Sequence, residues 1–189
     1  MHGWSMMTWL HLERGDRVVL GRSAAVDSLE TFEEFYAREY SAVVGLAFAL
    51  SGSRTASEDL AQEAFLAAHR DWARVAAYER SDLWIRRVVS NMSMSMFRRR
   101  YAEARAVARF AARPAASIPE LSADDAEFWA AVRSLPRRQA QVIALRYLDD
   151  RSVAEIAEIL GTATGTVKKQ LHDGRQNVVR RLRLEEDDA

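Results

Sequence analysis

The segment 135–175 constrains this chain most, because it carries the start and stop signals of two consecutive short helices separated by a sharp turn. Ser152 and Glu155 have the spacing of a reciprocal capping box, which begins a helix. Gly161 stands where a left-handed residue would end that helix, and a second helix is expected to open within residues 162–166. This order predicts a helix-turn-helix, a motif whose second helix lies in the major groove of DNA.

The second helix of this pair has one apolar and one polar side. Its apolar side carries Val167 and Leu171, which we expect to face the core. Its other side presents groups that can contact phosphates and base edges in a major groove. These outward residues are Lys168, Lys169, Gln170, His172 and Arg175. DNA is therefore the first candidate partner.

Composition restricts the class of protein. A chain of 189 residues with 49% hydrophobic residues can bury a core, as one body or as two small ones. It has no cysteine, so it has neither a disulfide framework nor a thiolate metal site, and no apolar run approaches the roughly 20 residues of a membrane span. The first residues also lack the basic start and apolar stretch of a signal peptide. We therefore expect a soluble cytoplasmic protein without membrane contact.

The charge is balanced overall but uneven along the chain. The formal net charge is zero, from 27 basic and 27 acidic residues, which is unusual for a protein that holds DNA by charge alone. Residues 80–100, however, contain six arginines and one acid, Asp82. This distribution predicts weak DNA binding by the isolated chain and a larger partner that supplies the remaining affinity.

The first half of the chain has helical periodicity. Thr31 and Glu34 form a capping box, and the helix that they begin is expected to end near 51–52. A second helix is predicted to begin at Ser57, followed by a loop at 75–82 and a third helix that ends in the arginine run after Phe97. These three helices can enclose one core.

The fold class that follows is all-α, with two small helical domains joined by a flexible linker. The linker is placed at 101–122 because Pro114 and Pro119 interrupt any continuous helix there. The predicted divisions are an unassigned N-terminal arm at 1–28, a first domain at 29–100, the linker, a helix-turn-helix domain at 123–184 and an acidic tail at 185–189.

Two separated motifs resemble one family. SEDLAQEAFLAAHRDW in the first domain and LPRRQ with GTVKKQLHDGR in the second resemble regions 2 and 4 of bacterial sigma-70 family RNA polymerase sigma factors. The nearest class is the extracytoplasmic-function (ECF, group IV) sigma factors. The resemblance covers roughly residues 29–100 and 125–184, and it includes neither a region 1.1 nor a region 3. Two motifs in this order are far more specific than a helix-turn-helix alone.

The first motif implies a surface that binds core RNA polymerase. By resemblance, Asp59, Gln62, Glu63 and Phe65 lie where the family docks on the clamp coiled coil of the beta-prime subunit. Asp59, Gln62 and Glu63 are three to four residues apart and share one helix face, which could meet a basic coiled coil. The alternative is that these acids only complement the helix dipole and face water.

The sequence WIRRVVSNMSMSMFRRR resembles the family's promoter −10 segment. Asn91 falls where the family places an asparagine that contacts a base flipped from the non-template strand, and an amide can both donate to and accept from a base edge. Ser90 and Ser95 depart from the pattern, which usually has arginine and aspartate there. The arginines that would hold the DNA backbone are Arg86, Arg87, Arg98, Arg99 and Arg100. The alternative is a solvated asparagine and a solubilising arginine run.

The second motif implies a surface that binds the promoter −35 element. Asp173 departs from the pattern, because the family often has arginine there; an acid could accept from a cytosine amine or form a local ion pair. The −35 sequence therefore cannot be carried over from the family. The residues in the positions that contact DNA are Arg151, Thr166, Lys168, Lys169, His172 and Arg175.

The leading hypothesis is therefore an ECF-type sigma factor, with core RNA polymerase (beta-prime clamp coiled coil and beta flap) and promoter DNA as partners and an anti-sigma protein as a further implied partner. The alternative is a stand-alone helix-turn-helix transcriptional regulator that binds DNA as a dimer. An enzyme finds little support, because no HExxH motif, nucleophile elbow or phosphate-binding glycine loop occurs. We expect no catalysis, no cofactor and no metal.

Overall fold

The computed structural model describes residues 30–93 and 123–187, which are called below the N-terminal half and the C-terminal half. Within these two ranges all regular structure is helical, which confirms the all-α class. The helices are α1 (Phe32–Ser51), α2 (Arg54–Arg70), α3 (Trp72–Val75), an unlabelled helix over 81–93, α5 (Ala123–Arg133), α6 (Arg137–Tyr147), α7 (Val153–Leu160) and α8 (Thr164–Asp187).

The start and end of α1 follow from its sequence. The amide of Glu34 donates to the Thr31 hydroxyl at 3.3 Å, and the amide of Thr31 donates to the Glu34 carboxylate at 2.9 Å. The helix ends at Gly52, whose φ of 68° is left-handed. Both predicted signals are confirmed, because each one satisfies backbone groups that a helix end leaves unpaired.

The predicted start of the second helix at Ser57 was wrong, since α2 begins three residues earlier at Arg54. Ser53 has extended backbone directly after Gly52, and its hydroxyl accepts from the amide of Ala56 at 3.4 Å. Ser57 is buried, and its hydroxyl donates to the carbonyl of Arg54 at 2.7 Å. By residue type either Ser53 or Ser57 could cap a helix. Ser53 does so because it directly follows the turn at Gly52.

Aromatic side chains from α1 and α2 form the centre of the N-terminal half. The ring of Phe65 lies 5.9 Å from that of Phe35, 4.8 Å from Tyr36 and 6.0 Å from Tyr40. Ile85 and Val89 from the helix at 81–93 are buried in the same cluster. The three predicted helices therefore enclose one core.

The C-terminal half is built around the helix-turn-helix. Ser152 and Glu155 form the predicted capping box of α7, and Gly161 ends that helix with a φ of 61°. The second helix then continues without interruption as α8, which is 24 residues long. Gly174 lets α8 approach α6 closely, because an added Cβ would lie 3.2 Å from Ile143 Cγ1.

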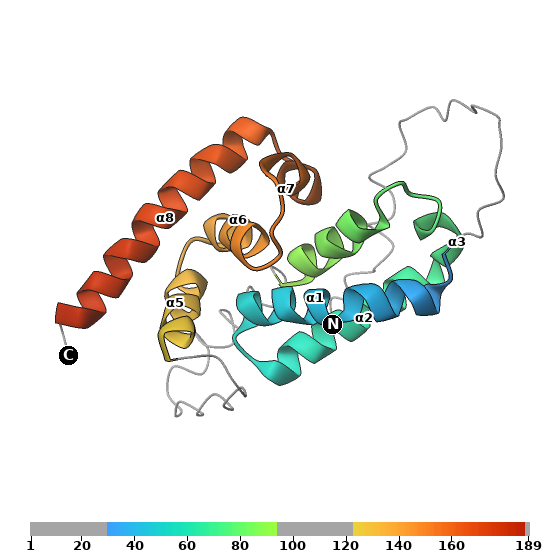
Figure 1. Ribbon diagram of the computed structural model, residues 1–189, viewed down its shortest axis with the longest axis horizontal. Helices are drawn as coiled ribbons and strands as arrows, with labels where there is room; N and C mark the ends of the chain where they lie inside the picture. Colours follow the sequence, from blue (N-terminus) through green and yellow to red (C-terminus); the bar gives the residue numbers. More distant parts are fainter. Residues whose placement is uncertain (1–29, 94–122, 188–189) are drawn as a thin grey trace, which may run out of the picture.

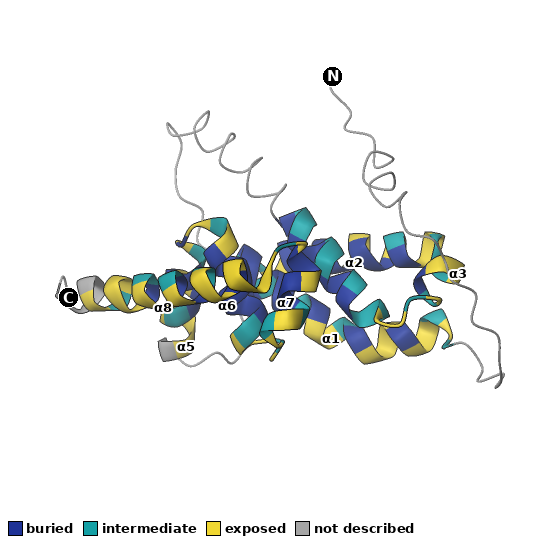
Figure 2. Cartoon of the chain, turned by 90° about the horizontal axis from the view of Figure 1, so that it is seen from above, coloured by how far each residue is buried: buried dark blue, intermediate teal, exposed yellow. Residues whose placement is uncertain are grey.

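The two halves pack against each other. The helix at 81–93 lies between α1 and α7, and α8 lies at the opposite end of the molecule from α3 (Figure 1). Buried residues of both halves join in one continuous hydrophobic cluster. In Figure 2 the dark blue of buried residues gathers in the middle of the molecule, where α6 and α7 overlap the N-terminal half. The predicted arm and linker fall outside the described residues, and α8 continues to Asp187, three residues into the predicted acidic tail. The domain boundaries stay a prediction.

No helix in the described part of the chain is both long and apolar enough to span a bilayer.

Candidate polymerase and nucleic-acid interfaces

The outer face of α2 carries the polar residues predicted to bind core polymerase. Asp59, Gln62 and Glu63 are exposed and lie on one side of the helix. Phe65 differs, because only 2% of its surface is exposed and its ring packs in the aromatic centre of the N-terminal half. A direct contact of Phe65 with a partner is therefore incompatible with this structure.

Leu66 is the apolar residue that this face actually offers. It is 53% exposed, and it follows Glu63 by three residues and Gln62 by four. Tyr36, on the neighbouring helix α1, is 38% exposed. The sequence could have shown this difference, because helical spacing places Leu66 on the same face as Asp59, Gln62 and Glu63 and turns Phe65 away from that face, toward the core.

The helix at 81–93 carries the residues predicted to bind the −10 element, and it holds them in different environments. Asn91 is half-buried. The side chain of Arg86 is only 3% exposed. Its Nη1 donates to Glu39 Oε2 at 2.6 Å, and its Nη2 donates to Asp149 Oδ1 at 3.0 Å. Its Nε donates a further hydrogen bond to Asp149. In this arrangement Arg86 cannot contact DNA, which contradicts its predicted role as a surface contact.

The charge of Arg86 is maintained by these partners. Burial lowers the pKa of its guanidinium, but the hydrogen bonds and charges of Asp149 and Glu39 outweigh burial and raise that pKa overall. Burial likewise raises the pKa of the Glu39 carboxyl, yet the hydrogen bonds from Arg38 and Arg86 leave it lowered. The pair is therefore a buried ion pair with its hydrogen bonds satisfied.

Two further groups of the helix at 81–93 contact the C-terminal half. The Nη2 of Arg87 donates to the carbonyl of Glu158 at 2.6 Å, and the side-chain amide of Gln141 donates to the carbonyl of Ser90 at 2.8 Å. Ser90 is fully buried, and a longer side chain at this position would push the helix at 81–93 away from α6. Ser95 and Arg98, Arg99 and Arg100 lie outside the described residues.

The first turns of α8 present most of the residues predicted to bind the −35 element. Thr166, Lys168, Lys169, His172 and Arg175 are all exposed. The Nζ of Lys169 lies 3.0 Å from Asp173 Oδ2, so the local ion pair proposed for this acid is present. This ion pair holds the Lys169 side chain toward its own helix.

Arg175 is positioned by a residue that the sequence analysis missed. Its Nε donates to the Tyr147 hydroxyl at 2.5 Å, and its guanidinium lies 5.6 Å from the centre of the Tyr147 ring. Tyr147 is half-exposed at the end of α6. Only the packing of α6 against α8 reveals this contact, because the two residues are 28 positions apart.

Arg151 does not lie with the other −35 residues on a free surface. Its Nη1 lies 2.7 Å from Asp82 Oδ2, and its Nε lies 2.8 Å from Asp149 Oδ2. Arg80, from the loop before the helix at 81–93, similarly pairs with Glu155. Arg151 is therefore engaged by an acid of the N-terminal half and cannot contact a phosphate in this arrangement.

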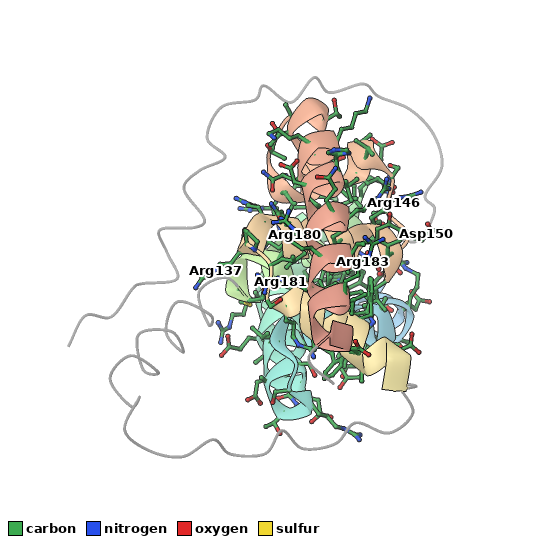
Figure 3. The ribbon with its side chains drawn as sticks, turned by 90° about the vertical axis from the view of Figure 1, so that its left-hand side faces the viewer. Arg137, Arg146, Asp150, Arg180, Arg181 and Arg183 are labelled. Carbon is green, nitrogen blue, oxygen red and sulfur yellow. The ribbon has the colours of Figure 1, made fainter. Side chains whose placement is uncertain are left out.

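Basic side chains continue beyond the predicted readers. Arg180, Arg181 and Arg183 project from the later turns of α8, and Arg137 and Arg146 project from α6 (Figure 3). The three arginines of α8 are exposed, and they extend the positive surface of this helix away from its first turns. Among the described residues no group of three or more side chains has the arrangement of a metal site.

Comparisons with known proteins agree with both motifs. The family model described as sigma-70 region 2 matches residues 35–103, and the model described as sigma-70 region 4 matches residues 125–178. The ECF RNA polymerase sigma factor SigW of Bacillus subtilis is 27% identical over 152 residues, covering 73% of this chain and 81% of SigW. The RNA polymerase sigma-E factor of Streptomyces coelicolor is 29% identical over 141 residues, covering 75% of this chain and 80% of that factor.

Solved structures give the same result. The sigma factor RpoE from Bartonella quintana, in complex with the anti-sigma factor NepR, superposes with a TM-score of 0.66 at 25% identity, covering 80% of this chain and 96% of RpoE. CnrH, in complex with the cytosolic domain of CnrY, has the same fold, with a TM-score of 0.58 at 22% identity and coverage of 81% and 88%. The two regions occur in the family's order, each on the helices that present its motif, and the chain belongs to the sigma-70 family of RNA polymerase sigma factors, in its ECF subfamily.

Proposed function

We propose that this protein binds core RNA polymerase through the outer face of α2 and directs it to promoters by contacting the −10 element with region 2 and the −35 element with region 4. The observation that carries the proposal is the exposure of the polar face of α2 and of the first turns of α8 on one chain. The first surface offers Asp59, Gln62, Glu63 and Leu66 to a basic and apolar partner.

The contact with the −35 element is proposed for Lys168, Lys169 and His172 in the major groove. Arg175, held by Tyr147, is suited to a backbone phosphate, because its guanidinium is already oriented. Because Asp173 pairs with Lys169, where the family often has arginine at position 173, the preferred −35 bases of this chain are proposed to differ from those of its relatives. The beta flap of the polymerase is the proposed second docking point of region 4.

The contact with the −10 element is proposed for Asn91, which would capture a base outside the duplex stack. Each unstacked step costs a few kcal/mol, and contacts in the protein pocket would offset that cost. Opening by capture needs no nucleotide hydrolysis by this chain, and we expect none. We also propose an anti-sigma protein as a regulatory partner, on the basis of the solved complex of RpoE with the anti-sigma factor NepR.

The alternative, a stand-alone regulator, is not favoured. Its activity would require only the helix-turn-helix half, whereas the region 2 model matches the other half of the chain.

Transcription in vitro tests the proposal directly. Purified core polymerase and this chain should yield transcripts that begin at defined points on genomic DNA fragments, and core polymerase alone should not. An absence of binding between core polymerase and this chain would overturn the proposal.

The role of Asn91 is tested by Asn91→Ala. We expect core binding to stay unchanged and permanganate reactivity of promoter thymines to fall, because the variant loses an amide that can both donate and accept. Asn91→Gln is the matched variant, since it keeps the amide and moves it by one methylene. Unchanged permanganate reactivity in Asn91→Ala would rule out the assigned role.

A further inference from the structure

The residues proposed to contact the −35 element belong to a longer stripe of side chains on α8. Lys168, His172, Arg175, Val179 and Arg183 follow one another at intervals of four, three, four and four residues, so they share one helix face. All five are exposed. The face that is proposed to enter the major groove therefore continues for about three turns beyond His172.

The later part of this stripe borders an open groove, called below the arginine groove. It has a volume of about 580 Å³ and is lined by Arg175, Gln176, Val179, Arg180 and Arg183. Of the described side chains that line it, three carry a guanidinium group and none carries a carboxylate. Val179, which is 47% exposed, is its apolar residue. This composition suits an anionic partner with small apolar parts, and the sugar-phosphate backbone of DNA meets both requirements.

The charges of the arginine groove are not neutralised within the described part of the chain. Arg180 and Arg183 are both exposed, and neither forms an ion pair with a described carboxylate. Arg175 is held by the uncharged hydroxyl and ring of Tyr147, so its guanidinium also keeps an unpaired positive charge. Three positive charges therefore lie along one side of the helix, where a row of phosphates could pair with them.

The length of α8 determines where these arginines lie when the first turns of the helix occupy a major groove. A helix of 24 residues is about 36 Å long, whereas the major groove is about 12 Å wide. The helix therefore leaves the groove at its edge, where the sugar-phosphate backbone lies. Arg180 and Arg183 follow Lys168 by 12 and 15 residues, which is about 18 and 22 Å along the helix axis. The promoter duplex is the polyanion nearest to them.

The orientation of the stripe is fixed by packing on the opposite side of α8. Leu171 and Val178 are buried there, and the side-chain amide of Asn177 donates to Gln139 Oε1 of α6 at 2.8 Å. Because α8 is continuous, its first turns and the arginine groove keep one fixed relative position. A duplex that binds the first turns in a defined orientation therefore meets the arginine groove in a defined orientation as well.

We propose that the arginine groove contacts backbone phosphates of promoter DNA beside the −35 bases, with Arg180 and Arg183 as the contacting side chains. This inference rests on the proposed function, because Lys168 and its neighbours must first place α8 on the −35 element. The added surface carries no base preference, since phosphate contacts fix the register of a protein on the duplex without reading its sequence. It supplies local positive charge in a chain whose net charge is zero.

The test variants are Arg180→Gln and Arg183→Gln, made singly and together, because glutamine removes the charge and keeps a long polar side chain. Arg181→Gln is the matched control for each single variant. Arg181 is exposed in the same turn but does not line the arginine groove. In Figure 3 it lies to the left of α8, on the side of Arg137, whereas Arg183 lies to the right. Circular dichroism and thermal melts check that all variants fold.

Ethylation interference locates the contacts, because ethylation neutralises single phosphates. The full chain is combined with core polymerase, and the probe is a promoter fragment found by transcription in vitro. In the wild type, ethylation at phosphates beside the −35 bases should reduce binding. Arg180→Gln and Arg183→Gln should each lose interference at some of these phosphates and lower the slope of log affinity against log salt by about one, and the double variant by about two. Arg181→Gln should match the wild type.

An unchanged interference pattern in the double variant, or an equal loss of interference in Arg181→Gln, would overturn the inference. Reduced transcription by the double variant with an unchanged interference pattern would overturn it too, and would assign the arginine groove to an acidic protein surface. The proposed function fails in a different way. In that case the wild type combined with core polymerase would show no interference either at the −35 element or beside it.

Discussion

Burial decides what a side chain at a predicted contact position is able to do. Phe65 and Leu66 are neighbours in one motif, yet the first ring is enclosed by α1 and the second side chain faces solvent. Arg86 carries the charge that a phosphate contact needs, but in this structure the charge is paired with the carboxylates of Glu39 and Asp149. Residue type therefore indicates a chemistry, and the environment determines whether it is available.

Substitutions at Phe65 and Leu66 separate stability from binding. Phe65→Ala should lower the free energy of unfolding by about 3–5 kcal/mol, because it leaves a cavity in the aromatic centre. Leu66→Ala should change that free energy by under about 0.5 kcal/mol and weaken binding to core polymerase. Denaturant melts and a core-binding titration check both. Weakened core binding by Phe65→Ala at full stability would restore Phe65 as a direct contact.

A substitution at Lys168 tests whether this side chain contacts one DNA phosphate. Lys168→Ala should weaken binding of the isolated chain to a promoter duplex and reduce the slope of log affinity against log salt by about one. Lys168→Arg keeps the charge and should keep the slope. A slope unchanged in Lys168→Ala would place this lysine away from the DNA backbone.

A helix in this protein begins at its capping residue where the sequence offers one candidate cap. Where it offers two, the backbone conformation of the preceding turn decides which of them caps the helix. The capping boxes at Thr31 and Ser152 were sufficient to locate the starts of α1 and α7. Ser53 and Ser57 are both suitable caps, and the left-handed Gly52 before Ser53 gave the earlier start. The same logic applies to the turn of the helix-turn-helix.

Two glycines around that turn should respond oppositely to alanine. Gly161→Ala should lower the free energy of unfolding by about 1–2 kcal/mol, because its φ of 61° is left-handed. Gly165→Ala, in the first turn of α8 with no atom within 4 Å of an added Cβ, should raise it by about 0.4–1 kcal/mol by restricting the unfolded chain. Thermal melts of the two variants give the comparison, and a stable Gly161→Ala would show that the turn tolerates a side chain.

At the scale of the whole molecule, the packing of region 4 on region 2 links acid–base chemistry to shape. The hydrogen bond from Arg80, together with those from Ser152, lowers the pKa of the Glu155 carboxyl to about 2. Burial raises the pKa of the Asp82 carboxyl, but the hydrogen bonds and charges of Arg80 and Arg151 leave it lowered. The Glu39 carboxyl behaves in the same way. Glu155 and Asp82 each pair with an arginine of the other half, so both favour the packing of the two halves while they are ionised, whereas both partners of Glu39 lie in its own half.

The two halves should therefore separate from each other in acid. A carboxyl whose pKa is lowered by packing favours the packed state above its ordinary pKa, and this contribution is lost as the pH falls through the lowered value. Because the sequence has no cysteine, dyes can be placed through Thr55→Cys on α2 and Val179→Cys on α8, both exposed positions. Energy transfer between these dyes should be constant above about pH 4.5, the ordinary pKa of glutamate, and should fall toward pH 2. Opening on a rise in pH from neutral to pH 9 would contradict the charge assignment. Asp150→Asn should leave the titration unchanged.

The sequence alone determined the all-α class, the helix-turn-helix, the two family motifs and the exposed polar face of α8, because each depends on residues a few positions apart. Periodicity and capping are local, and so they are visible in the order of residues. Only the tertiary structure decided that Phe65 is core, that Tyr147 orients Arg175 and that Asp149 joins Arg86 to Arg151. Tyr147 and Arg175 are 28 positions apart and Arg86 and Asp149 are 63 positions apart, and such contacts form only when helices distant in the sequence pack together.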